Sequence, residues 1–417
     1  MPNHSNASYD VAVIGGGPAG STVATLLQRQ VHRCLILEST SFPRYHIGES
    51  LIPHTYGTFD RLGLLSKMRQ SQFPVKHSVR FVSPSGKEAA PFYFHETIEG
   101  ERAKTWQVKR SEFDVICQDN AREAGVEIRS ATKVSKVHFD GSQAVGLRVE
   151  TFGCQPEDIT AKVIVDASGR ATVLGKQLDL KVDIPGLNKS AIWTYYRGAY
   201  RREGIDAGET TVFMIPERGW FWYIPLPDDI VSVGIVASSD YLFRSSNHYE
   251  DVFPVEVDLC QPLAEWLADA EAVQPLRGIR KLAYINKQVV GDGWVMIGDA
   301  AGFLDPVYSS GLFLALVSGD LASNCIHEAL VANDVRAQKL GEFVPGLWEG
   351  IEVIHRLVRA FYDPGFSFPE FAKRFPEQRS ALIDCLIGDV VGRDMSGFLA
   401  SLAQMTPPPI PLHASVQ

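Results

Sequence analysis

Residues Tyr9 to Glu38, YDVAVIGGGPAGSTVATLLQRQVHRCLILE, decide the fold of the first part of the chain. A short apolar run leads into a glycine-rich turn, then a stretch with apolar residues at helical spacing, then a second apolar run that ends in an acid. This order predicts one βαβ unit. Gly15 allows the tight turn, Gly17 lets a phosphate approach the backbone, and Gly20 lets the helix pack close to the strand. The unit therefore predicts a bound dinucleotide, with its pyrophosphate at the helix N-terminus.

The acid that closes the unit supports the same prediction. Glu38 stands at the end of the second strand, where a carboxylate accepts hydrogen bonds from a ribose. A lone G-x-G-x-x-G is weak evidence, and a glycine-rich turn without a ligand is the alternative. Strand, helix, second strand and terminal acid all occur here in register, which favours the dinucleotide.

The composition narrows the class of protein. The 417 residues are 45% hydrophobic and 21% charged, which is typical of a folded globular protein. The net charge of -9 comes without a basic stripe and argues against a nucleic-acid partner. Six scattered cysteines show no metal-ligand spacing and fit a reducing compartment. No targeting pattern opens the sequence and no segment has about 18 uninterrupted apolar residues, so we expect a cytoplasmic protein without a membrane span.

Two later segments have the pattern of a strand that ends at a turn of small residues. Lys162 to Arg170 reads KVIVDASGR, and Gly293 to Asp305 reads GWVMIGDAAGFLD. They resemble the second and third fingerprints of the FAD-dependent monooxygenase superfamily, which implies FAD rather than NAD as the cofactor. In that superfamily the acid of the Gly-Asp pair, here Asp299, bonds the ribityl chain, and the helix that follows points its N-terminus at the flavin ring.

The segment WQVKRSEFD, Trp106 to Asp114, resembles a further stretch of that superfamily. The resemblance implies that Arg110 contacts the cofactor. For an isolated arginine a surface ion pair is the alternative, and the three surrounding fingerprints favour the cofactor.

The pattern changes between these motifs. Residues 190–237 alternate apolar and polar residues and are rich in aromatics, which predicts an antiparallel sheet. From residue 322 onward apolar residues recur at spacings of three and four, which predicts helices, and the proline-rich end TPPPIPLHASVQ predicts an extended tail. We expect an α/β fold: an FAD-binding doubly wound domain of the glutathione-reductase-like kind, an antiparallel-sheet substrate domain and a short helical C-terminal region.

The expected boundaries follow from the same patterns. The discontinuous FAD-binding domain takes residues 1–89, 104–180 and 276–345. The substrate domain takes 90–103 and 181–275, the helical region takes 346–405, and a flexible tail takes 406–417.

Three segments outside the FAD fingerprints carry a narrower resemblance. FPRYHIGESL, residues 42–51, is similar to a segment shared by flavin-dependent halogenases and geranylgeranyl reductases. GWFWYIP, residues 219–225, matches the W-x-W-x-I-P signature of the halogenases. GDAAGFLDPVYSSGLFL, residues 298–314, resembles their halide loop, in which backbone amides near a Ser-Gly pair, here Ser310 and Gly311, hold chloride.

A fourth segment carries a candidate lysine. FPVKHSVRF, residues 73–81, is similar to the stretch with the active lysine in halogenases of phenols and pyrroles, which implies that role for Lys76. Ser78 stands where those enzymes usually have glycine. In the family FADH2, O2 and chloride or bromide give hypohalous acid, which is led to the lysine and halogenates an electron-rich ring.

The halide loop also bears on the substrate. The tryptophan-specific members use a glutamate near this loop as the base for the ring proton, and YSSG at 308–311 has none. This favours a phenol or pyrrole ring, free or bound to a carrier protein, in secondary metabolite biosynthesis. Members that act on carrier-bound substrates are commonly longer at the C-terminus, so the short tail leaves a more open pocket and a free substrate as the other possibility.

The resemblance implies three groups of site residues. The catalytic group is Lys76, Ser310 and Gly311. The cofactor-binding group is Gly15, Gly17, Ala19, Gly20, Glu38, Arg44, Ile47, Gly48, Glu49, Ser50, Arg110, Asp166, Gly169, Asp299, Gly302, Pro306, Gly311 and Leu312. The substrate and tunnel group is Trp220, Trp222, Ile224, Pro225 and Phe303. The two tryptophans would separate the organic substrate from the flavin, although core packing on one strand face is the alternative, and we expect no metal.

Two other functions stay open. An FAD-dependent reductase or hydroxylase of the geranylgeranyl-reductase type shares part of the motifs, but a prenyl reductase needs neither a halide nor Lys76. A non-catalytic FAD-binding module is the second. Halogenases take FADH2 from solution, and no second nicotinamide-binding glycine motif is visible, so a separate NAD(P)H-dependent flavin reductase is the expected partner beside a small aromatic substrate.

Overall fold

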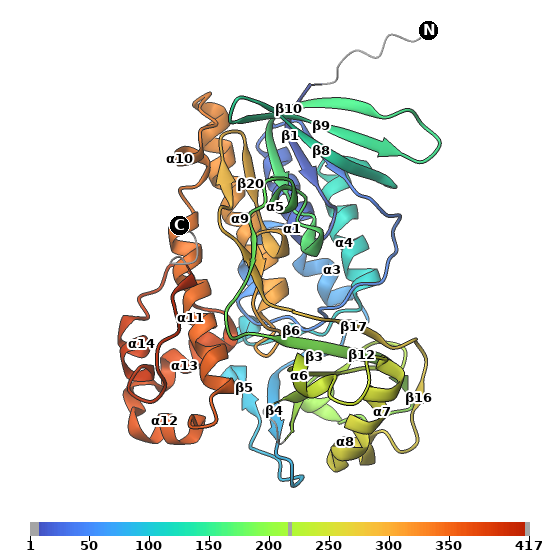
Figure 1. The fold of residues 1–417 in the computed structure, drawn as a ribbon, viewed down its shortest axis with the longest axis vertical. Helices are drawn as coiled ribbons and strands as arrows, with labels where there is room; N and C mark the ends of the chain where they lie inside the picture. The colour runs from blue at the N-terminus through green and yellow to red at the C-terminus, as the bar shows by residue number, and fades with distance from the viewer. Residues whose placement is uncertain (1–7, 216–218, 413–417) are drawn as a thin grey trace.

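The structure is a computed structural model that describes residues 8–215 and 219–412, and Figure 1 shows its three parts. A large sheet with the chain's first strands and its covering helices lies at the top, and a second large sheet lies below it. Helices from the last quarter of the chain pack along one side. The α/β fold class, with a second sheet and a helical C-terminal region, is confirmed.

The upper sheet has eight strands. Its central order is β19-β20-β10-β1-β2-β7, and the pairs β20-β10, β10-β1, β1-β2 and β2-β7 are parallel. β9 pairs antiparallel with β10, and β8 with β9. The bounds are Ser8–Ile14 (β1), Cys34–Leu37 (β2), Glu127–Arg129 (β7), Thr132–Asp140 (β8), Gln143–Thr151 (β9), Glu157–Asp166 (β10), Val290–Gly291 (β19) and Trp294–Met296 (β20).

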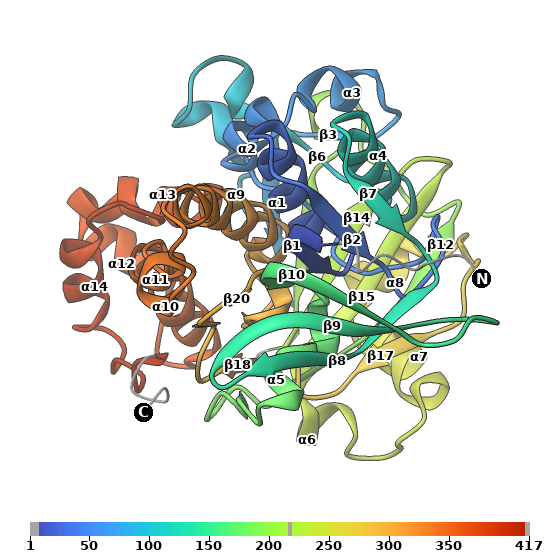
Figure 2. The same cartoon turned by 90° about the horizontal axis from the view of Figure 1, so that it is seen from above.

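Different elements cover the two faces of this sheet. On one face α1 (Pro18–Arg29), α4 (Arg110–Glu123) and α9 (Ser310–Val331) bury apolar side chains against the central strands. On the other face the β8-β9 ribbon curls over the sheet, as Figure 2 shows. The predicted βαβ unit is therefore β1-α1-β2, and its two strands are buried on both faces of the sheet.

The lower sheet has the order β16-β12-β15-β14-β13-β4-β5, with β17 also paired to β12. Its neighbours are antiparallel except β13 and β4, which run parallel. The bounds are Ser78–Val82 (β4), Phe92–Tyr93 (β5), Lys189–Arg197 (β12), Thr210–Met214 (β13), Trp220–Pro225 (β14), Ile230–Ser238 (β15), Glu271–Ala272 (β16) and Arg277–Ile279 (β17).

The central strands of the lower sheet are buried on both faces. All six residues of β14 are buried, with Trp220 and Trp222 on one face and Phe221 and Tyr223 on the other. α6 (Ser239–Leu242), α7 (Tyr249–Leu259) and α8 (Gln261–Trp266) supply the apolar side chains that cover the second face. Strands enclosed on both sides can carry apolar residues on both, so aromatics follow one another along β14.

Two small sheets connect the large ones. β11 (Lys181–Asp183), β18 (Tyr284–Asn286) and β21 (Gly302–Phe303) form one, and β3 (Val75–Lys76) with β6 (Thr105–Trp106) forms the other. Three short helices follow strands of the upper sheet along the chain: α2 (Thr55–Arg61) and α3 (Leu65–Gln70) after β2, and α5 (Val173–Gln177) after β10.

The strand pairing differs from the predicted boundaries at several points. β4, within the predicted FAD-binding segment 1–89, pairs with β13 of the lower sheet, and β17, within 276–345, pairs with β12. β11, within the predicted substrate segment 181–275, joins the three-stranded sheet. Such exchanges depend on long-range pairing, which a local pattern does not contain. The boundaries themselves remain a prediction.

The helix predicted to open directly after Gly298 and Asp299 begins later. Residues 298–300 form one 3-10 turn, β21 pairs with β18, and α9 starts only at Ser310. The pairing holds Gly302 and Phe303 extended, and a bend and turn at residues 306–308 follow before the helix begins.

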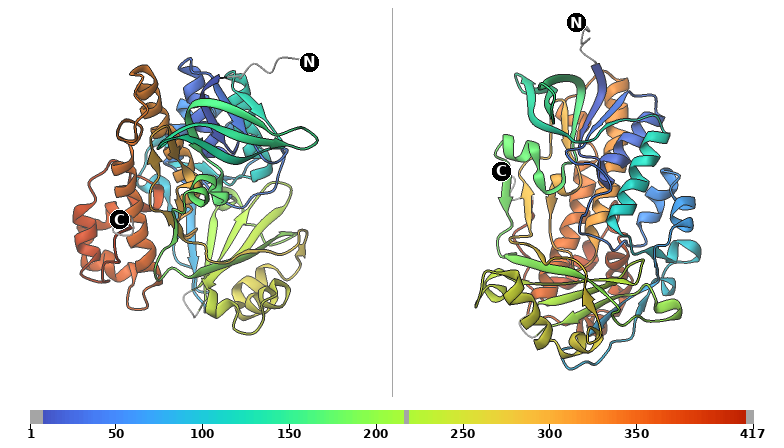
Figure 3. Two further views of the ribbon diagram at one scale, coloured as in Figure 1. Left: turned by 45° about the horizontal axis from the view of Figure 1, so that its top comes forward. Right: turned by 90° about the vertical axis from the view of Figure 1, so that its right-hand side faces the viewer.

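The C-terminal helices are α10 (Ala337–Leu340), α11 (Val344–Tyr362), α12 (Phe368–Arg374), α13 (Arg379–Ile387) and α14 (Ser396–Leu402), and Figure 3 shows them beside both large sheets. Part of the predicted tail 406–417 is held in place: Thr406 donates to Asp363 at 2.7 Å, and the buried Leu412 donates its N–H to Glu352 at 3.1 Å. Residues 413–417 lie outside the described residues. Across residues 8–215 and 219–412, every helix falls short of the length or the hydropathy that a membrane span requires.

Gly234 in β15 gives a test of this packing. A Cβ at Gly234 would lie 2.2 Å from Cζ2 of Trp222 and 2.6 Å from Cβ of Trp193, so the two indoles use the space that glycine leaves. We expect Gly234→Ala to lower the free energy of unfolding by about 1–3 kcal/mol through overpacking. Urea denaturation followed by tryptophan fluorescence measures this. Gly57→Ala, in α2 with nothing within 4 Å of the new methyl, is the control and should not destabilise. An unchanged midpoint for Gly234→Ala would contradict the packing described.

Candidate active site

The turn after β1 fits a pyrophosphate. Gly15 has φ +99°, and a Cβ there would lie 2.5 Å from the Ala167 carbonyl oxygen, so only glycine is accommodated. Gly17 is the N-cap of α1 and provides no side-chain cap, and the first turn contains no acid. A Cβ at Gly17 would meet only a guanidinium nitrogen of Arg44, at 3.5 Å. Free helix N–H groups beside an arginine and an open glycine surface suit the phosphates of FAD.

Glu38 holds the same turn together. Its carboxylate is 5% exposed and accepts hydrogen bonds from the backbone N–H groups of Gly16 and Thr40, both at 2.9 Å. It therefore ties the end of β2 to the glycine turn. A bond to a ribose hydroxyl remains a prediction.

Arg110 is buried rather than part of a surface ion pair. Its guanidinium makes two bonds to Asp114, at 2.7 and 3.0 Å, and donates to the carbonyl of Ile47 at 2.8 Å. Arg44 approaches the same carboxylate at 3.5 Å. These contacts position the loop around Gly48, whose φ is +99°. A contact of Arg110 or Arg44 with the cofactor is a prediction that this geometry allows.

The two acids of the later fingerprints have different surroundings. Asp166 is fully buried, and its carboxylate accepts from the N–H groups of Ser168 and Leu174 at 3.0 and 2.7 Å, so it holds its own turn. Asp299 keeps part of its surface open. Burial raises the pKa of Asp299 to about 6, against the opposing effect of Arg170 and Arg110. The position of Asp299 suits a ligand hydroxyl better than that of Asp166.

Lys76 is completely buried. Its Nζ donates to Oγ of Ser50 at 2.8 Å and to the carbonyl of Leu51 at 3.1 Å, and among the described residues no carboxylate pairs with it. Burial lowers the pKa of Lys76 to about 7. A neutral amine has two N–H groups, both of which find acceptors here, and its lone pair is left free.

Ser78 leaves the lysine in place. It has no unusual φ and donates to Glu209 at 2.9 Å, so the replacement of the family's glycine does not bend the strand.

Glu49 and Ser50 join the lysine to the tryptophan motif. The Ser50 Oγ that accepts from Lys76 also lies 3.1 Å from Oγ1 of Thr210. Glu49 is 2% exposed and accepts from the hydroxyl of Tyr195, and the nearby hydroxyl of Ser232 acts to lower its pKa. Burial raises the pKa of Glu49 to about 7. One carboxyl oxygen, Oε2, has no hydrogen-bond partner within the described parts of the chain. An orphaned buried oxygen is an observation that a bound ligand would explain.

Trp220 and Trp222 stand side by side on the face that looks toward α9 and α11. Their ring centroids are 6.1 Å apart, and they are 2% and 6% exposed. Trp222 donates to Ser232 at 3.0 Å, and Trp220 donates to the hydroxyl of Tyr362 at 2.9 Å. The wall is thus fixed at one end by its own sheet and at the other by α11.

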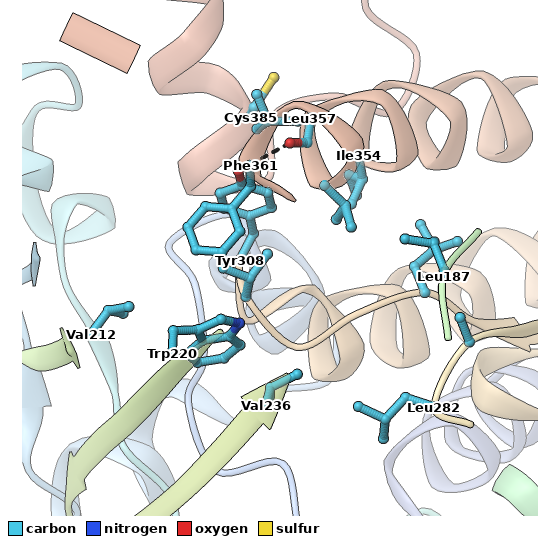
Figure 4. Packing of buried hydrophobic residues seen from close by; sticks show 14 of the residues in the cluster. Leu187, Val212, Trp220, Val236, Leu282, Tyr308, Ile354, Leu357, Phe361 and Cys385 are labelled. Carbon is cyan, nitrogen blue, oxygen red and sulfur yellow. Dashed lines mark hydrogen bonds between the residues drawn. The ribbon is translucent and has the colours of Figure 1, made fainter. Parts of the chain in front are cut away.

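The loop before α9 contacts the same helix. Tyr308 donates to the carbonyl of Leu357 at 3.2 Å and stacks edge-on against Phe361, as Figure 4 shows. Asp305 accepts from Tyr362 at 3.0 Å, and burial raises the pKa of Asp305 to about 6. The loop is therefore enclosed between β14 and α11.

The N-terminus of α9 suits a small anion. Ser309 occupies the N-cap with φ +55° and gives no side-chain cap, and Ser310 is 4% exposed. A Cβ on Gly311 would lie 3.4 Å from the ring of Phe303, an ordinary van der Waals distance, so this ring lies directly beside the start of α9. Uncapped N–H groups at a buried helix start are what a halide requires.

The other expected site residues lie on the same elements. Ala19 and Gly20 are in α1, Gly169 follows β10 with φ +60°, Gly302 is in β21, Leu312 is in α9, Pro306 lies between those two elements, and Ile224 and Pro225 end β14. Three side chains of this region, Tyr195, Tyr362 and Asp305, were not among the predicted site residues. Each makes its contact across more than 50 residues, and for the two tyrosines the one signal in the sequence was the excess of aromatics.

Comparison with known proteins identifies relatives along almost the whole chain. The family described as tryptophan halogenase matches residues 10–101 and 87–364. The 1H-pyrrole-2-carbonyl-[peptidyl-carrier protein] chlorinase of Pseudomonas fluorescens is 32% identical over 409 residues, which cover 93% of this chain and 90% of that one. The corresponding brominase of Pseudoalteromonas luteoviolacea is 32% identical over 330 residues, covering 78% and 79%. The structure of the flavin-dependent brominase Bmp2 superposes with a TM-score of 0.85 at 29% identity, over 95% of this chain and 96% of that one.

Substitution of Gly17 and of Gly20 should have different effects, one on cofactor binding and the other on folding. We expect Gly17→Ala to fold normally but to weaken FAD binding about tenfold, or about 1.4 kcal/mol, because its methyl occupies the surface that a phosphate approaches. Gly20→Ala should instead destabilise the fold, since its Cβ would lie 2.0 Å from the carbonyl oxygen of Gly15. Flavin fluorescence titration and thermal unfolding measure the two effects. Equal FAD affinity in Gly17→Ala and wild type would refute the assignment.

Proposed function

The chain belongs to the flavin-dependent halogenase family, and we propose that it halogenates an electron-rich aromatic ring at a pocket beside Lys76. It is an enzyme whose reaction uses FADH2, O2 and chloride or bromide. When bound, FADH2 would supply two of the four electrons that reduce O2, and the halide would supply the other two as it is oxidised to hypohalous acid.

The observation that supports this role is that the amine of Lys76 is fully buried and donates to Ser50 and to the carbonyl of Leu51. Burial lowers its pKa to about 7, so that a substantial neutral fraction exists at neutral pH. The lone pair on Nζ is free to meet an electrophilic halogen, and a charged ammonium would have none. Phe94, which is also fully buried, lies beside Nζ at 5.7 Å from its ring centroid. This enclosure keeps water from competing for the halogen.

Trp220 and Trp222 serve as the partition of the site. Each indole is held by a hydrogen bond at Nε1, so the pair cannot swing aside without losing a buried bond. A fixed aromatic wall of this kind would keep a ring-sized substrate away from the flavin and let a small oxidant pass. Ser310 and Gly311 would hold the halide with their N–H groups on the cofactor side.

The substrate class rests on the relatives. A pyrrole on a carrier protein is the substrate in the printed names of two of them, and the match to the chlorinase spans 90% of its length. A relative that is named for a carrier-bound substrate therefore has nearly the length of this chain. A short C-terminal tail is thus no reason to expect a free substrate instead. We infer a pyrrole or phenol ring, with a carrier-bound pyrrole as the first substrate to test.

Two further inferences complete the proposal. A separate NAD(P)H-dependent flavin reductase supplies FADH2, because the chain has one dinucleotide-binding turn and the family reaction needs flavin that is already reduced. The six cysteines are all free, and four of them are buried, which supports a reducing compartment such as the cytoplasm.

Replacing the lysine tests the assignment. We expect Lys76→Ala and Lys76→Met to bind FAD and to release hypohalous acid that a small scavenger detects, while halogenation of the ring falls at least about 100-fold. Mass spectrometry of the product, with FADH2, O2, bromide and a pyrrole or phenol panel, gives the rate. The exposed Lys87→Ala is the control. Halogenation at the wild-type rate in Lys76→Met would remove Lys76 from the mechanism.

The protonation of Lys76 predicts a pH dependence. The folded-state pKa is lowered from 10.5 to about 7, so the amine is neutral above this pH and charged below it. We expect the ring-halogenation rate to fall as pH falls through about 7, while scavenger-detected hypohalous acid follows a different profile. Single-turnover rates across this range measure both, and an acidic limb shared by the two would contradict a role for the neutral amine.

A further inference from the structure

The hydroxyl of Tyr362 on α11 joins the tryptophan wall to the loop that leads into α9. Its oxygen lies 2.9 Å from Nε1 of Trp220 and 3.0 Å from Oδ2 of Asp305. An indole N–H can only donate, so the oxygen accepts from Trp220 and the single hydroxyl hydrogen goes to Asp305. The wall on β14 and the loop before α9 are therefore connected through one atom.

The carboxylate of Asp305 shapes this loop. Its Oδ1 accepts from the backbone N–H of Val307 at 3.0 Å, which closes a turn of the kind that aspartate favours, and Oδ2 is left for Tyr362. Asp305 is 2% exposed, so water has little access to either bond. Ser310 begins α9 three residues after Val307. Tyr362 thus orients a side chain that sets the backbone leading to the proposed halide site.

The ring of Tyr362 is held independently of its hydroxyl. Nζ of Lys189, at the start of β12, lies 3.7 Å from the ring centroid, and Phe361 packs edge-on at 5.1 Å. Lys189 is also the cation that acts on the carboxylate of Asp305. Loss of the hydroxyl alone would therefore leave the ring packed and break the connection between the wall and the loop.

The two tryptophans of the wall differ in this respect. Trp222 is bonded within its own sheet, whereas Trp220 is bonded to α11. The loop has a second contact with that helix, since Tyr308 donates to the carbonyl of Leu357 and packs against Phe361. Figure 4 shows the rings of Tyr308 and Phe361 on the α11 side of Trp220. A change in the loop therefore reaches Trp220 before it reaches Trp222.

We propose that Tyr362 is a positioning residue that couples occupancy of the halide site to the tryptophan wall. A halide on the N–H groups of Ser310 and Gly311 would restrain the loop that ends there. The restrained loop holds Asp305, and through Tyr362 it holds the indole of Trp220. Coupling is reciprocal, so the bond at Trp220 strengthens halide binding by the factor by which the halide strengthens that bond.

The reaction gives this coupling a purpose. FADH2, O2 and a ring C–H can also yield a phenol, FAD and one molecule of water, without any halide. A wall that is held most firmly when the halide is bound excludes the ring from the flavin just when halogenation can proceed. The inference rests on the proposed function for the identity of the anion, and on the two hydrogen bonds of Tyr362 for the connection.

Removal of the hydroxyl tests the connection during turnover. We expect Tyr362→Phe to raise the KM for bromide about 5- to 10-fold, at the lower end of couplings between sites. Because saturating bromide restrains the loop directly, kcat should change less than about twofold. Initial rates at varied bromide, with mass spectrometry of the halogenated and oxygenated products, measure both. At low bromide the oxygenated share should rise.

The matched control removes a similar bond on the other face of β14. Tyr223 is buried and donates to the carbonyl of Tyr200 at 2.5 Å, so Tyr223→Phe also loses one tyrosine hydrogen bond. It should keep the wild-type KM for bromide. A wild-type KM in Tyr362→Phe, or an equal rise in Tyr223→Phe, would overturn the coupling.

A double-mutant cycle separates positioning from a general loss of stability. Trp220→Phe removes the other end of the connection, so it should raise the KM for bromide in the wild-type background and have no further effect in Tyr362→Phe. Thermal unfolding verifies that each variant is folded at the assay temperature. Two residues that act independently would multiply their fold-changes, and this result would count against the coupling.

The indole N–H signals read the coupling without turnover. In protein saturated with oxidised FAD, bromide should shift the Nε1 signal of Trp220 in the NMR spectrum and slow its hydrogen exchange, and should affect Trp222 less. Tyr362→Phe should abolish the response of Trp220. A Trp220 signal that bromide does not move, or moves equally in Tyr362→Phe, would refute the inference. A protein that shows the response and halogenates no ring would instead sink the proposed function.

Discussion

The amine of Lys76 lies inside the protein, and no carboxylate among residues 8–215 and 219–412 pairs with it. Much of the surrounding structure follows from this constraint. Lowering a lysine pKa from 10.5 to about 7 corresponds to several kcal/mol of unfavourable desolvation at neutral pH. That free energy must come from packing elsewhere. The segment 49–51 supplies the local part, since it is bonded to residues 106–108 like a strand and offers Ser50 and Leu51 as acceptors.

The same segment connects the two halves of the site. Ser50 contacts the lysine, and Glu49, on the other face of the chain, contacts the lower sheet through Tyr195. Adjacent residues in an extended segment point to opposite sides, so one dipeptide can serve two environments. One short segment therefore contacts both the lysine and the lower sheet that carries the tryptophan wall.

Sequence reasoning predicted the parts of the fold that local chemistry determines. Gly15, Gly17 and Gly20 predicted the first turn because glycine is needed where the backbone turns tightly or another group comes close. The alternation of apolar and polar residues in 190–237 predicted the lower sheet. The position of Lys76 followed from its flanking motif. The partners of Tyr195 and Tyr362, the pairing of β4 with β13 and the late start of α9 could not be predicted, because each depends on contacts between segments far apart in the chain.

The two indoles of β14 are anchored to different bodies, and this has an evolutionary consequence. Trp222 is bonded within its own sheet, whereas Trp220 is bonded to Tyr362 on α11. A lineage that rebuilt or exchanged the C-terminal helices would alter the surroundings of Trp220 and the loop at Tyr308 while Trp222, Glu49 and Lys76 kept their geometry. Because this loop leads into Ser310 and Gly311, an exchange of α11 would change the surroundings of the proposed halide site and of Trp220 together, and would leave the hydrogen bonds of Lys76 in place.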